Sequence, residues 1–313
     1  MALRKILGWR ALLALMLALG LLAGCATLDE RQRAWIFQPT DRTWAGGLAA
    51  AEGMQDVWID FDSREAGQTV KLHGLWLPQD RPGAPVLLYL HGARWDVRGS
   101  AFRMRSMHAL GFSVLGIDYR GFGRSTATLP SETLAYEDAQ AAWAWLAREH
   151  ADVPRYIFGH SLGGAIAVHL ATEAPDATGL MVEGTFTSIP DVFSHMKWGW
   201  LPVGPLITQR FDAATRIGRV RMPVLVVHGS EDKLIPPALG RELYERAPAP
   251  KQFVLVEGGS HHNTNRMGQA QYREALAQLF GFGDKPAAPQ AAAGLSAAWP
   301  TAAAPAQNDR PRQ

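Results

Sequence analysis

A Gly-x-Ser-x-Gly turn constrains the fold of this chain more than any other feature. Residues 157–164 read Ile-Phe-Gly-His-Ser-Leu-Gly-Gly, and they follow the strand-like Tyr156. Apolar residues at helical spacing, many of them Ala and Leu, come next. Only small residues fit two positions on either side of such a serine, because the strand and the helix nearly touch there. The pattern predicts a strand, a tight turn and a helix, with Ser161 pushed outward at the edge of a sheet.

Ser161 is therefore the candidate nucleophile, and later turns supply its candidate partners. A serine hydroxyl attacks only when a base takes its proton, and the base needs an orienting carboxylate. In this architecture the partners follow in the order Ser, then Asp or Glu, then His. One later apolar run ends in a turn that carries Asp232, and the next ends in a turn that carries His261 and His262. Both turns come at the C-terminal ends of expected strands, where catalytic groups gather in open parallel sheets.

Six short segments together carry a resemblance to a known family. They are 89–92 (Tyr-Leu-His-Gly), 118–125 (Asp-Tyr-Arg-Gly-Phe-Gly-Arg-Ser), 159–164 (Gly-His-Ser-Leu-Gly-Gly), 182–188 (Val-Glu-Gly-Thr-Phe-Thr-Ser), 228–232 (His-Gly-Ser-Glu-Asp) and 262–263 (His-Asn). With them the chain resembles the serine hydrolases of the α/β-hydrolase superfamily over about residues 55–282. It is most similar to the small-lid branch that includes depalmitoylase-like, bud-emergence-like and serine aminopeptidase-like hydrolases.

The resemblance implies a role for each member of a catalytic triad. Ser161 attacks the acyl carbon. The family spacing His-Gly-x-x-Asp assigns the orienting carboxylate to Asp232, with the neighbouring Glu231 as the alternative. The His-Asn pair of the branch favours His262 as the base, whereas a looser Gly-x-x-His alignment favours His261. His262 is the residue that we expect to pair with Asp232.

Two backbone N–H groups are expected to stabilise the oxyanion. The N–H of Leu162 lies at the start of the expected helix, where the helix dipole also favours negative charge. By resemblance to the family's His-Gly-x loop, Ala93 supplies the second N–H. The chain departs from the branch here, since Ala93-Arg94 stands where Asn-Ala is usual. No cofactor is expected, and no metal either, because the histidine and carboxylate spacings do not form a ligand set.

The N-terminus reads as a bacterial lipoprotein signal peptide over residues 1–24. A positive region containing Arg4, Lys5 and Arg10 precedes an apolar stretch at 11–23 that is short for a membrane span. It ends in Leu-Ala-Gly-Cys, which resembles a lipobox and makes Cys25 the lipidation site. An ordinary signal peptide or a single-span anchor is the alternative. Cys25 is the only cysteine, so a disulfide framework is excluded.

The lipobox also predicts where the protein lies and what it contacts. Multiple acyl chains give stable attachment to a membrane. Ala26 follows Cys25 in place of Asp, which by resemblance indicates the outer membrane, facing the periplasm. Removing Arg4, Lys5 and Arg10 leaves 28 basic residues against 29 acidic ones, and no long basic run remains. Nucleic acid is therefore a poor partner. An acylated or small-molecule substrate is expected, and the oligomeric state is left open.

The expected fold class is α/β, with a mostly parallel eight-stranded sheet covered by helices on both faces and a short helical lid. Residues 25–54 are predicted to be a lipidated N-terminus and tether with some helix, residues 55–282 the catalytic domain, and the Ala- and Pro-rich residues 283–313 a disordered tail. The expected strands are 57–61, 70–77, 86–90, 114–118, 156–158, 179–183, 224–228 and 252–257. The expected helices are 99–110, 131–149, 162–174, 237–247 and 268–281.

The lid is expected at about residues 186–218, between the sixth and seventh strands. Its apolar density fits a pocket for an acyl chain, and it fits equally well a short lid that packs onto the body. Trp95, beside the expected oxyanion loop, is a second candidate for the pocket wall. These features indicate a membrane-anchored serine hydrolase that cleaves esters or thioesters through an acyl-enzyme. The alternatives are a peptidase or amidase, which the few lid acids Asp191 and Asp212 support little, and a noncatalytic binding lipoprotein.

Overall fold

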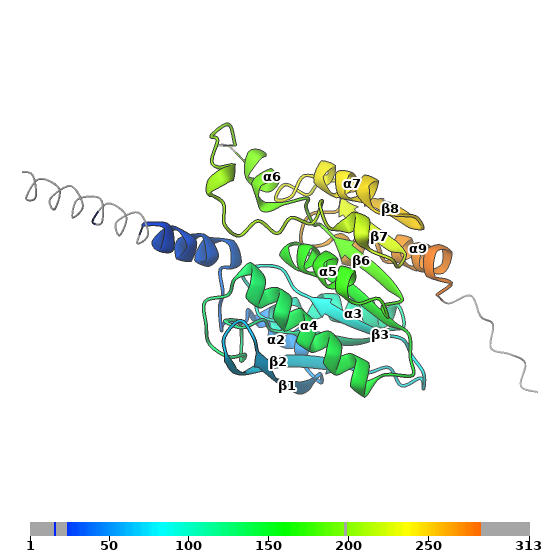
Figure 1. Ribbon diagram of the computed structural model, residues 1–313. Coiled ribbons are helices and arrows are strands. Elements are labelled where there is room, and N and C mark those ends of the chain that lie inside the picture. The colour runs from blue at the N-terminus through cyan, green and yellow to red at the C-terminus, as the bar shows by residue number, and fades with distance from the viewer. Residues whose placement is uncertain (1–15, 17–23, 197–198, 283–313) are drawn as a thin grey trace, which may run out of the picture.

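The computed structural model describes residue 16, residues 24–196 and residues 199–282. Its centre is an eight-stranded sheet in the order β1-β2-β4-β3-β5-β6-β7-β8, in which β1, β2 and β4 pair antiparallel and all other neighbours pair parallel (Figure 1). The strands are β1 (Gln55–Ser63), β2 (Gln68–Leu77), β3 (Val86–Leu90), β4 (Ser113–Ile117), β5 (Arg155–His160), β6 (Gly179–Glu183), β7 (Val224–Gly229) and β8 (Lys251–Val256). All eight expected strands are confirmed.

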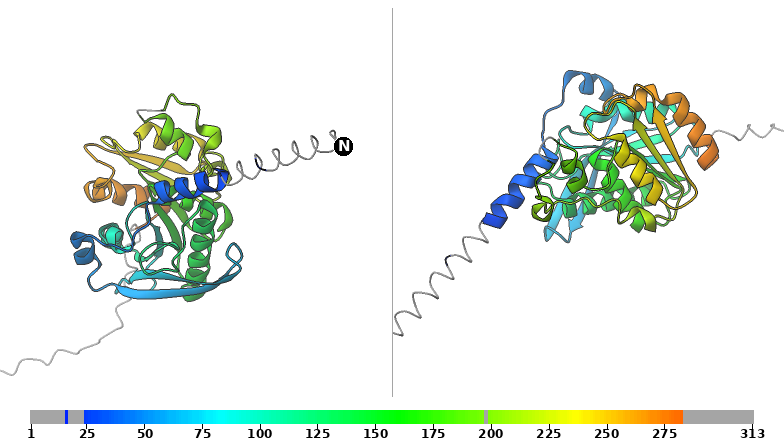
Figure 2. Two further views of the ribbon diagram at one scale, coloured as in Figure 1. Left: turned by 90° about the vertical axis from the view of Figure 1, so that its left-hand side faces the viewer. Right: turned by 90° about the horizontal axis from the view of Figure 1, so that it is seen from above.

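Helices cover both faces of the sheet, as expected (Figures 1 and 2). The α-helices are α2 (Ala45–Ala51), α3 (Ala101–Ala109), α4 (Glu132–Glu149), α5 (Leu162–Glu173), α6 (Ile189–Ser194), α7 (Pro237–Arg246), α8 (Thr264–Met267) and α9 (Gln269–Phe280), and the short 3₁₀ helices are η1 (Arg98–Ser100), η2 (Gly204–Leu206) and η3 (Ile217–Arg219). The five expected helices correspond to α3, α4, α5, α7 and α9, whose bounds agree with the expected ranges to within two residues.

Alternation along the central strands separates two apolar cores. In β3, Val86, Leu88 and Leu90 pack into the core under α4, α5 and α7. The intervening Leu87 and Tyr89 pack into the opposite core, under α3 and α9. Successive side chains of a strand point to opposite faces, so a strand buried on both sides is apolar throughout. The parallel strands are therefore fixed between two helical layers, and their C-terminal ends meet at one edge.

The segment expected to be a tether is instead part of the folded body, because long-range contacts that no local pattern reveals hold it there. Residues 24–37 form a helix (dark blue in Figure 1). Asp29 accepts hydrogen bonds from Thr208 and Gln209, and the Phe37 side chain, 0% exposed, belongs to the core under α4 and α5. The prediction of a tether over residues 25–54 is wrong for this part of the chain.

Several apolar side chains of the described lid segment are buried. Phe186, Ile189, Val192 and Phe211 are buried in the main core. The Ser188 side chain caps α6 by accepting a hydrogen bond from the Asp191 N–H. Of the two alternatives left open for this segment, packing onto the body is the one observed for these side chains.

Part of the N-terminal and C-terminal predictions lies outside the described residues. This holds for residues 1–15 and 17–23 of the signal peptide and for the tail at 283–313. Cys25 is described, and it is an exposed free thiol at the start of the helix 24–37. Within the described part of the chain, no helix has the length and apolarity that a membrane crossing requires.

Candidate active site

Ser161 occupies the sharp turn between β5 and α5, as its motif predicts. Its φ of 56° and ψ of −123° are unusual for a residue with a side chain. The surrounding backbone fixes this conformation, because the Ser161 N–H donates to the Glu183 carbonyl at 2.9 Å and the Thr185 hydroxyl donates to the Ser161 carbonyl at 2.9 Å. Strained conformations persist where neighbours over-determine them, often at active sites.

Glycines allow the strand and the helix to approach as closely as the turn requires. A Cβ atom on Gly159 would lie 2.2 Å from the Gly163 carbonyl oxygen, and one on Gly163 would lie 2.1 Å from the Leu90 carbonyl oxygen. Neither backbone oxygen can move aside without breaking the sheet or the helix. The two glycines of the motif are therefore steric requirements, as expected.

Asp232 lies in the turn after β7 and is held by contacts on both carboxylate oxygens. Its Oδ1 accepts hydrogen bonds from the N–H groups of Leu234 at 2.9 Å and Ile235 at 2.8 Å. Its Oδ2 lies 2.7 Å from His261 Nδ1 and 3.4 Å from His228 Nε2. Burial by itself raises the pKa of Asp232, but hydrogen bonds from His228 and His261 outweigh it, so the pKa is lowered. The carboxylate is thus kept ionised.

The histidine paired with Asp232 is His261, so the expected pairing of His262 is wrong. The Asn263 side chain accepts a hydrogen bond from the Ser260 N–H at 2.7 Å and closes the turn after β8. This turn buries His261 against Asp232 and leaves His262 exposed, with the two imidazole rings 84° apart. The Nδ1–H of His261 donates to Asp232, so its Nε2 is left to accept a proton.

A buried ionic network, which the sequence did not predict, holds the backbone of His261. The guanidinium of Arg103, on α3, donates to the His261 carbonyl at 2.9 Å and to Glu183 Oε1 at 3.1 Å. The Tyr272 hydroxyl donates to the other Glu183 oxygen at 2.6 Å. Burial and then the charge of Arg103 lower the pKa of the adjacent His160 well below its usual range. The helix expected at 99–110 carries both Arg103 and Arg105, and no local signal distinguishes the buried Arg103 from the exposed Arg105.

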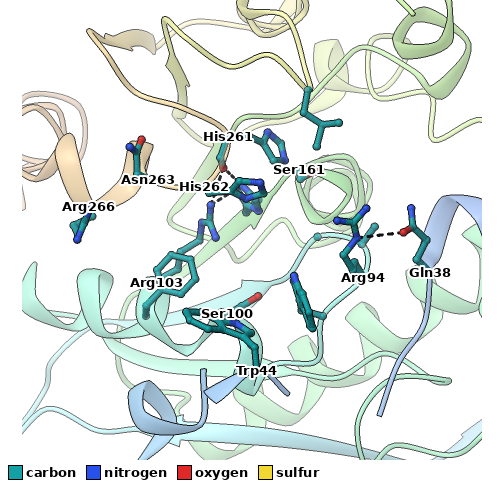
Figure 3. Close-up of a pocket in the computed structure, with 17 residues that line it drawn as sticks. Gln38, Trp44, Arg94, Ser100, Arg103, Ser161, His261, His262, Asn263 and Arg266 are labelled. Carbon is teal, nitrogen blue, oxygen red and sulfur yellow. Dashed lines mark hydrogen bonds between the residues drawn. The ribbon is translucent and has the colours of Figure 1, made fainter. Parts of the chain in front are cut away.

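The pocket above Ser161 has a volume of about 840 Å³ (Figure 3). Its apolar wall comes from Trp44, Trp95, Phe102 and Leu234, so the expectation for Trp95 is confirmed. None of the described residues at 186–218 lines this pocket. The described part of the lid thus does not contribute to its apolar wall, whereas the N-terminal segment supplies Trp44.

Both expected oxyanion residues lie beside Ser161. Ala93 lines the same pocket, and Leu162 is the first residue of α5. The loop at residues 91–94 is close enough that a Cβ atom on Gly92 would lie 3.0 Å from Ser161 Cβ. The oxyanion roles themselves stay predictions. Within the described chain, no group of three or more His, Cys, Asp or Glu side chains is placed to hold a metal ion.

Comparisons with known proteins point to hydrolases. A family model described as serine aminopeptidase, S33, matches residues 82–211 and 205–265. An uncharacterized protein of Mycobacterium tuberculosis (strain ATCC 25618 / H37Rv) is 36% identical over 237 residues, which are 75% of this chain and 82% of that protein. The lysophosphatidylserine lipase ABHD12 of Danio rerio is 32% identical over 190 residues, which are 54% of this chain and 49% of the lipase.

Solved esterase structures share the fold. The Pyrococcus furiosus esterase Pf2001 superimposes with a TM-score of 0.60 at 17% identity, over 78% of this chain and 98% of the esterase. Est1E from Butyrivibrio proteoclasticus, in a structure with ferulic acid bound, gives a TM-score of 0.59 at 18% identity, over 72% of this chain and 99% of Est1E. At these identities the similarity concerns the fold alone.

Proposed function

Because the chain belongs to the hydrolase family described as serine aminopeptidase, S33, we propose that it is a serine hydrolase that cleaves ester or thioester bonds through an acyl-enzyme. One observation carries this proposal. His261 and Ser161 both line the pocket, Ser161 is held at a strained turn, and the buried Asp232 pairs with His261 from behind the pocket wall. A nucleophile, a base and an orienting carboxylate are the complete set of groups that acyl transfer needs.

The reaction proceeds in two halves. Ser161 Oγ attacks the acyl carbon while His261 Nε2 takes the hydroxyl proton, and the backbone N–H groups of Ala93 and Leu162 stabilise the oxyanion. His261 then gives its proton to the leaving alcohol or thiol, and an acyl-Ser161 ester remains. Water attacks this ester with the same base, releases the carboxylic acid and restores Ser161. Asp232 orients the imidazole and stabilises its transient positive charge.

The lining of the pocket favours esters over peptide N-termini. An aminopeptidase must bind a protonated amine, and a carboxylate is the usual partner for such a cation. Among the described residues that line the pocket there is no Asp or Glu, whereas Trp44, Trp95 and Phe102 suit an apolar acyl group. The relative named as a lysophosphatidylserine lipase agrees with this preference.

Active-site labelling tests the proposal and its noncatalytic alternative together. We expect a fluorophosphonate probe to label the wild-type protein at Ser161, and Ser161→Ala to abolish labelling and to lower ester turnover by about 10⁶-fold. A panel of matched esters, thioesters and amides then ranks the bond types. Absence of labelling in the wild type would favour the binding lipoprotein, and faster cleavage of amides would favour the peptidase.

We further propose that the protein is anchored to the outer membrane through a lipidated Cys25, facing the periplasm. The lipobox-like Leu-Ala-Gly-Cys and the exposure of the Cys25 thiol support this. The intact mass of the membrane-extracted protein is the test. We expect a chain that begins at Cys25 with added acyl groups, and a Cys25→Ser variant that lacks them. An unmodified mass in the wild type contradicts the anchor and leaves the hydrolase proposal intact.

A further inference from the structure

The charged side chains that line the pocket are all cationic. Arg94, Arg103 and Arg266 lie in its wall, and among the described lining residues there is no carboxylate. The whole chain has 31 basic and 29 acidic residues, so this bias is local. Arg103 is neutralised by Glu183, but Arg94 and Arg266 form no ion pair with any carboxylate within the described residues. Two uncompensated guanidinium groups therefore face the space that a substrate enters.

Arg94 is held in a conformation that disfavours a side chain. It is exposed and has a φ of 84°, in the region that favours glycine. Its N–H donates to the Phe37 carbonyl at 2.8 Å, and its Nε donates to Gln38 Oε1 at 3.2 Å. Glycine adopts such a φ at a lower energetic cost, so the presence of arginine here indicates that its side chain has a function. The Gln38 contact engages only Nε and leaves the terminal nitrogens of Arg94 available.

Arg94 lies in the wall of the same pocket as His262. Burial is the main cause that lowers the pKa of His262; electrostatic interactions with His261, Arg103 and Arg94 lower it further, and the interaction with Asp232 partly offsets them. Figure 3 shows Arg94 and Arg266 on opposite sides of the pocket, with the two histidines between them. A guanidinium group without an ion-pair partner among the described residues therefore stands on each side of the pocket.

We propose that Arg94 is a specificity residue that binds an anionic group, a carboxylate or a phosphate, on the ester substrate. Arg266 attracts the same group from the opposite wall without binding it directly. A guanidinium presents paired N–H donors that match a carboxylate or phosphate oxygen pair. Arg94 follows Ala93 directly, so an anion bound there lies next to the expected oxyanion site and orients the ester over Ser161. This inference rests on the proposed hydrolase function and names its substrate class.

Matched substrate pairs test the proposal and identify the source of the anion. The first pair is p-nitrophenyl hemiglutarate and p-nitrophenyl pentanoate, which differ by a carboxylate on the acyl side. The second pair is a lysophosphatidic acid and the monoacylglycerol of the same chain, which differ by a phosphate on the leaving side. We expect the wild type to favour the anionic member of at least one pair by about tenfold in kcat/KM, and less at high salt. The pair that shows the preference identifies the source.

The variants separate specificity from folding. Arg94→Gln should remove the preference, Arg94→Lys should retain part of it, and Arg266→Gln should lower it only about two- to threefold. Arg94→Gly should remove it without lowering the melting temperature, since glycine accepts a φ of 84°. Arg273→Gln, an exposed arginine of α9 outside the pocket, is the matched control and should leave the preference unchanged. Equal rates within both pairs, or a preference that survives Arg94→Gln, would overturn the proposal.

A binding measurement keeps this inference distinct from the hydrolase proposal. Calorimetry with the Ser161→Ala protein should show that glutarate or glycerol phosphate binds, that glycerol does not, and that adding Arg94→Gln abolishes the binding. If no ester is hydrolysed but the anion still binds through Arg94, the hydrolase proposal fails and the anion site stands. If esters are hydrolysed but neither anion binds, the anion site fails alone.

Discussion

At the scale of single residues, the candidate site depends on the contacts that hold the carboxylate of Asp232 in place. Two backbone N–H groups and two imidazole rings surround its carboxylate. His228 directs Nε2 at both Asp232 and the Ile235 carbonyl, which lies 2.9 Å away, so this nitrogen carries the proton. These contacts fix the orientation of the carboxylate relative to His261. The tautomer of the candidate base is thereby fixed before any substrate arrives.

The two adjacent histidines give a direct prediction at this scale. His261→Ala should lower kcat by at least about 10⁴-fold, because the proton of Ser161 then has no acceptor. His262→Ala should cost about tenfold or less, since His262 makes no contact with Asp232 that would orient it. Steady-state kinetics on a neutral ester, with circular dichroism as the control for folding, measures both. Losses in the reverse order would return the role of base to His262.

The sequence located most of this site because its signals are local. Ser161 is marked by glycines within two residues, and Asp232 by its spacing from the end of an apolar run. The choice between His261 and His262 depended on how the turn after β8 closes, and the Asn263 side chain decides this. Arg103 lies far from both histidines in sequence. A contact that forms only when two distant segments pack leaves no local pattern.

At the scale of elements, the helix 24–37 and the loop after it join the N-terminus to the pocket. Gln32 donates to the Leu206 carbonyl at 2.7 Å and accepts from the Thr208 N–H at 2.9 Å. The Phe37 carbonyl then accepts from the N–H of Arg94, beside the expected oxyanion loop. The strands and long helices were predictable from alternation and helical spacing. This docking was not, because the helix is polar along much of its length and buries only its last turn.

Alanine substitutions of two aromatic residues of this helix should therefore have very different effects on the free energy of unfolding. Phe37→Ala should lower the free energy of unfolding by about 3–5 kcal/mol, because it leaves a cavity in the main core. Trp35, which is 54% exposed, serves as the matched control, and Trp35→Ala should change it by less than about 0.5 kcal/mol. Urea unfolding of both variants is the measurement. Equal, small effects would mean that the segment is a tether after all.

At the scale of the whole molecule, buried and half-buried histidines make the fold sensitive to acid. Burial is the largest cause that lowers the pKa of His91, His160 and His169. In His169 the charges of Arg216 and Arg219 add to it, and the pKa falls to about 4. These rings stay neutral in the folded state, whereas the unfolded chain binds protons below its ordinary pKa of 6.5. The stability that these three groups contribute is therefore complete above about pH 6.5 and is lost as the pH falls below it.

The pH dependence of unfolding should report these groups. The free energy of unfolding should change little between pH 7 and 8 and should fall steadily between about pH 6.5 and 4. His169→Gln removes one such group, so the slope between these values should be smaller by up to about 1.4 kcal/mol per pH unit. Urea unfolding of both proteins at pH 8 and pH 5 gives the comparison. An unchanged slope in His169→Gln would show that this ring does not contribute.

The docked helix also limits how far the pocket can travel from any attachment at Cys25. A helix over residues 24–37 is about 20 Å long, and its contacts to the body prevent it from moving as a flexible linker would. If the molecule is bound to a bilayer, its pocket would then stay within a thin layer of solvent just above the lipid surface. Its encounters would be two-dimensional, with substrates that dwell in or on that surface, and an ester dissolved far from the membrane would meet the pocket only by diffusing down to it.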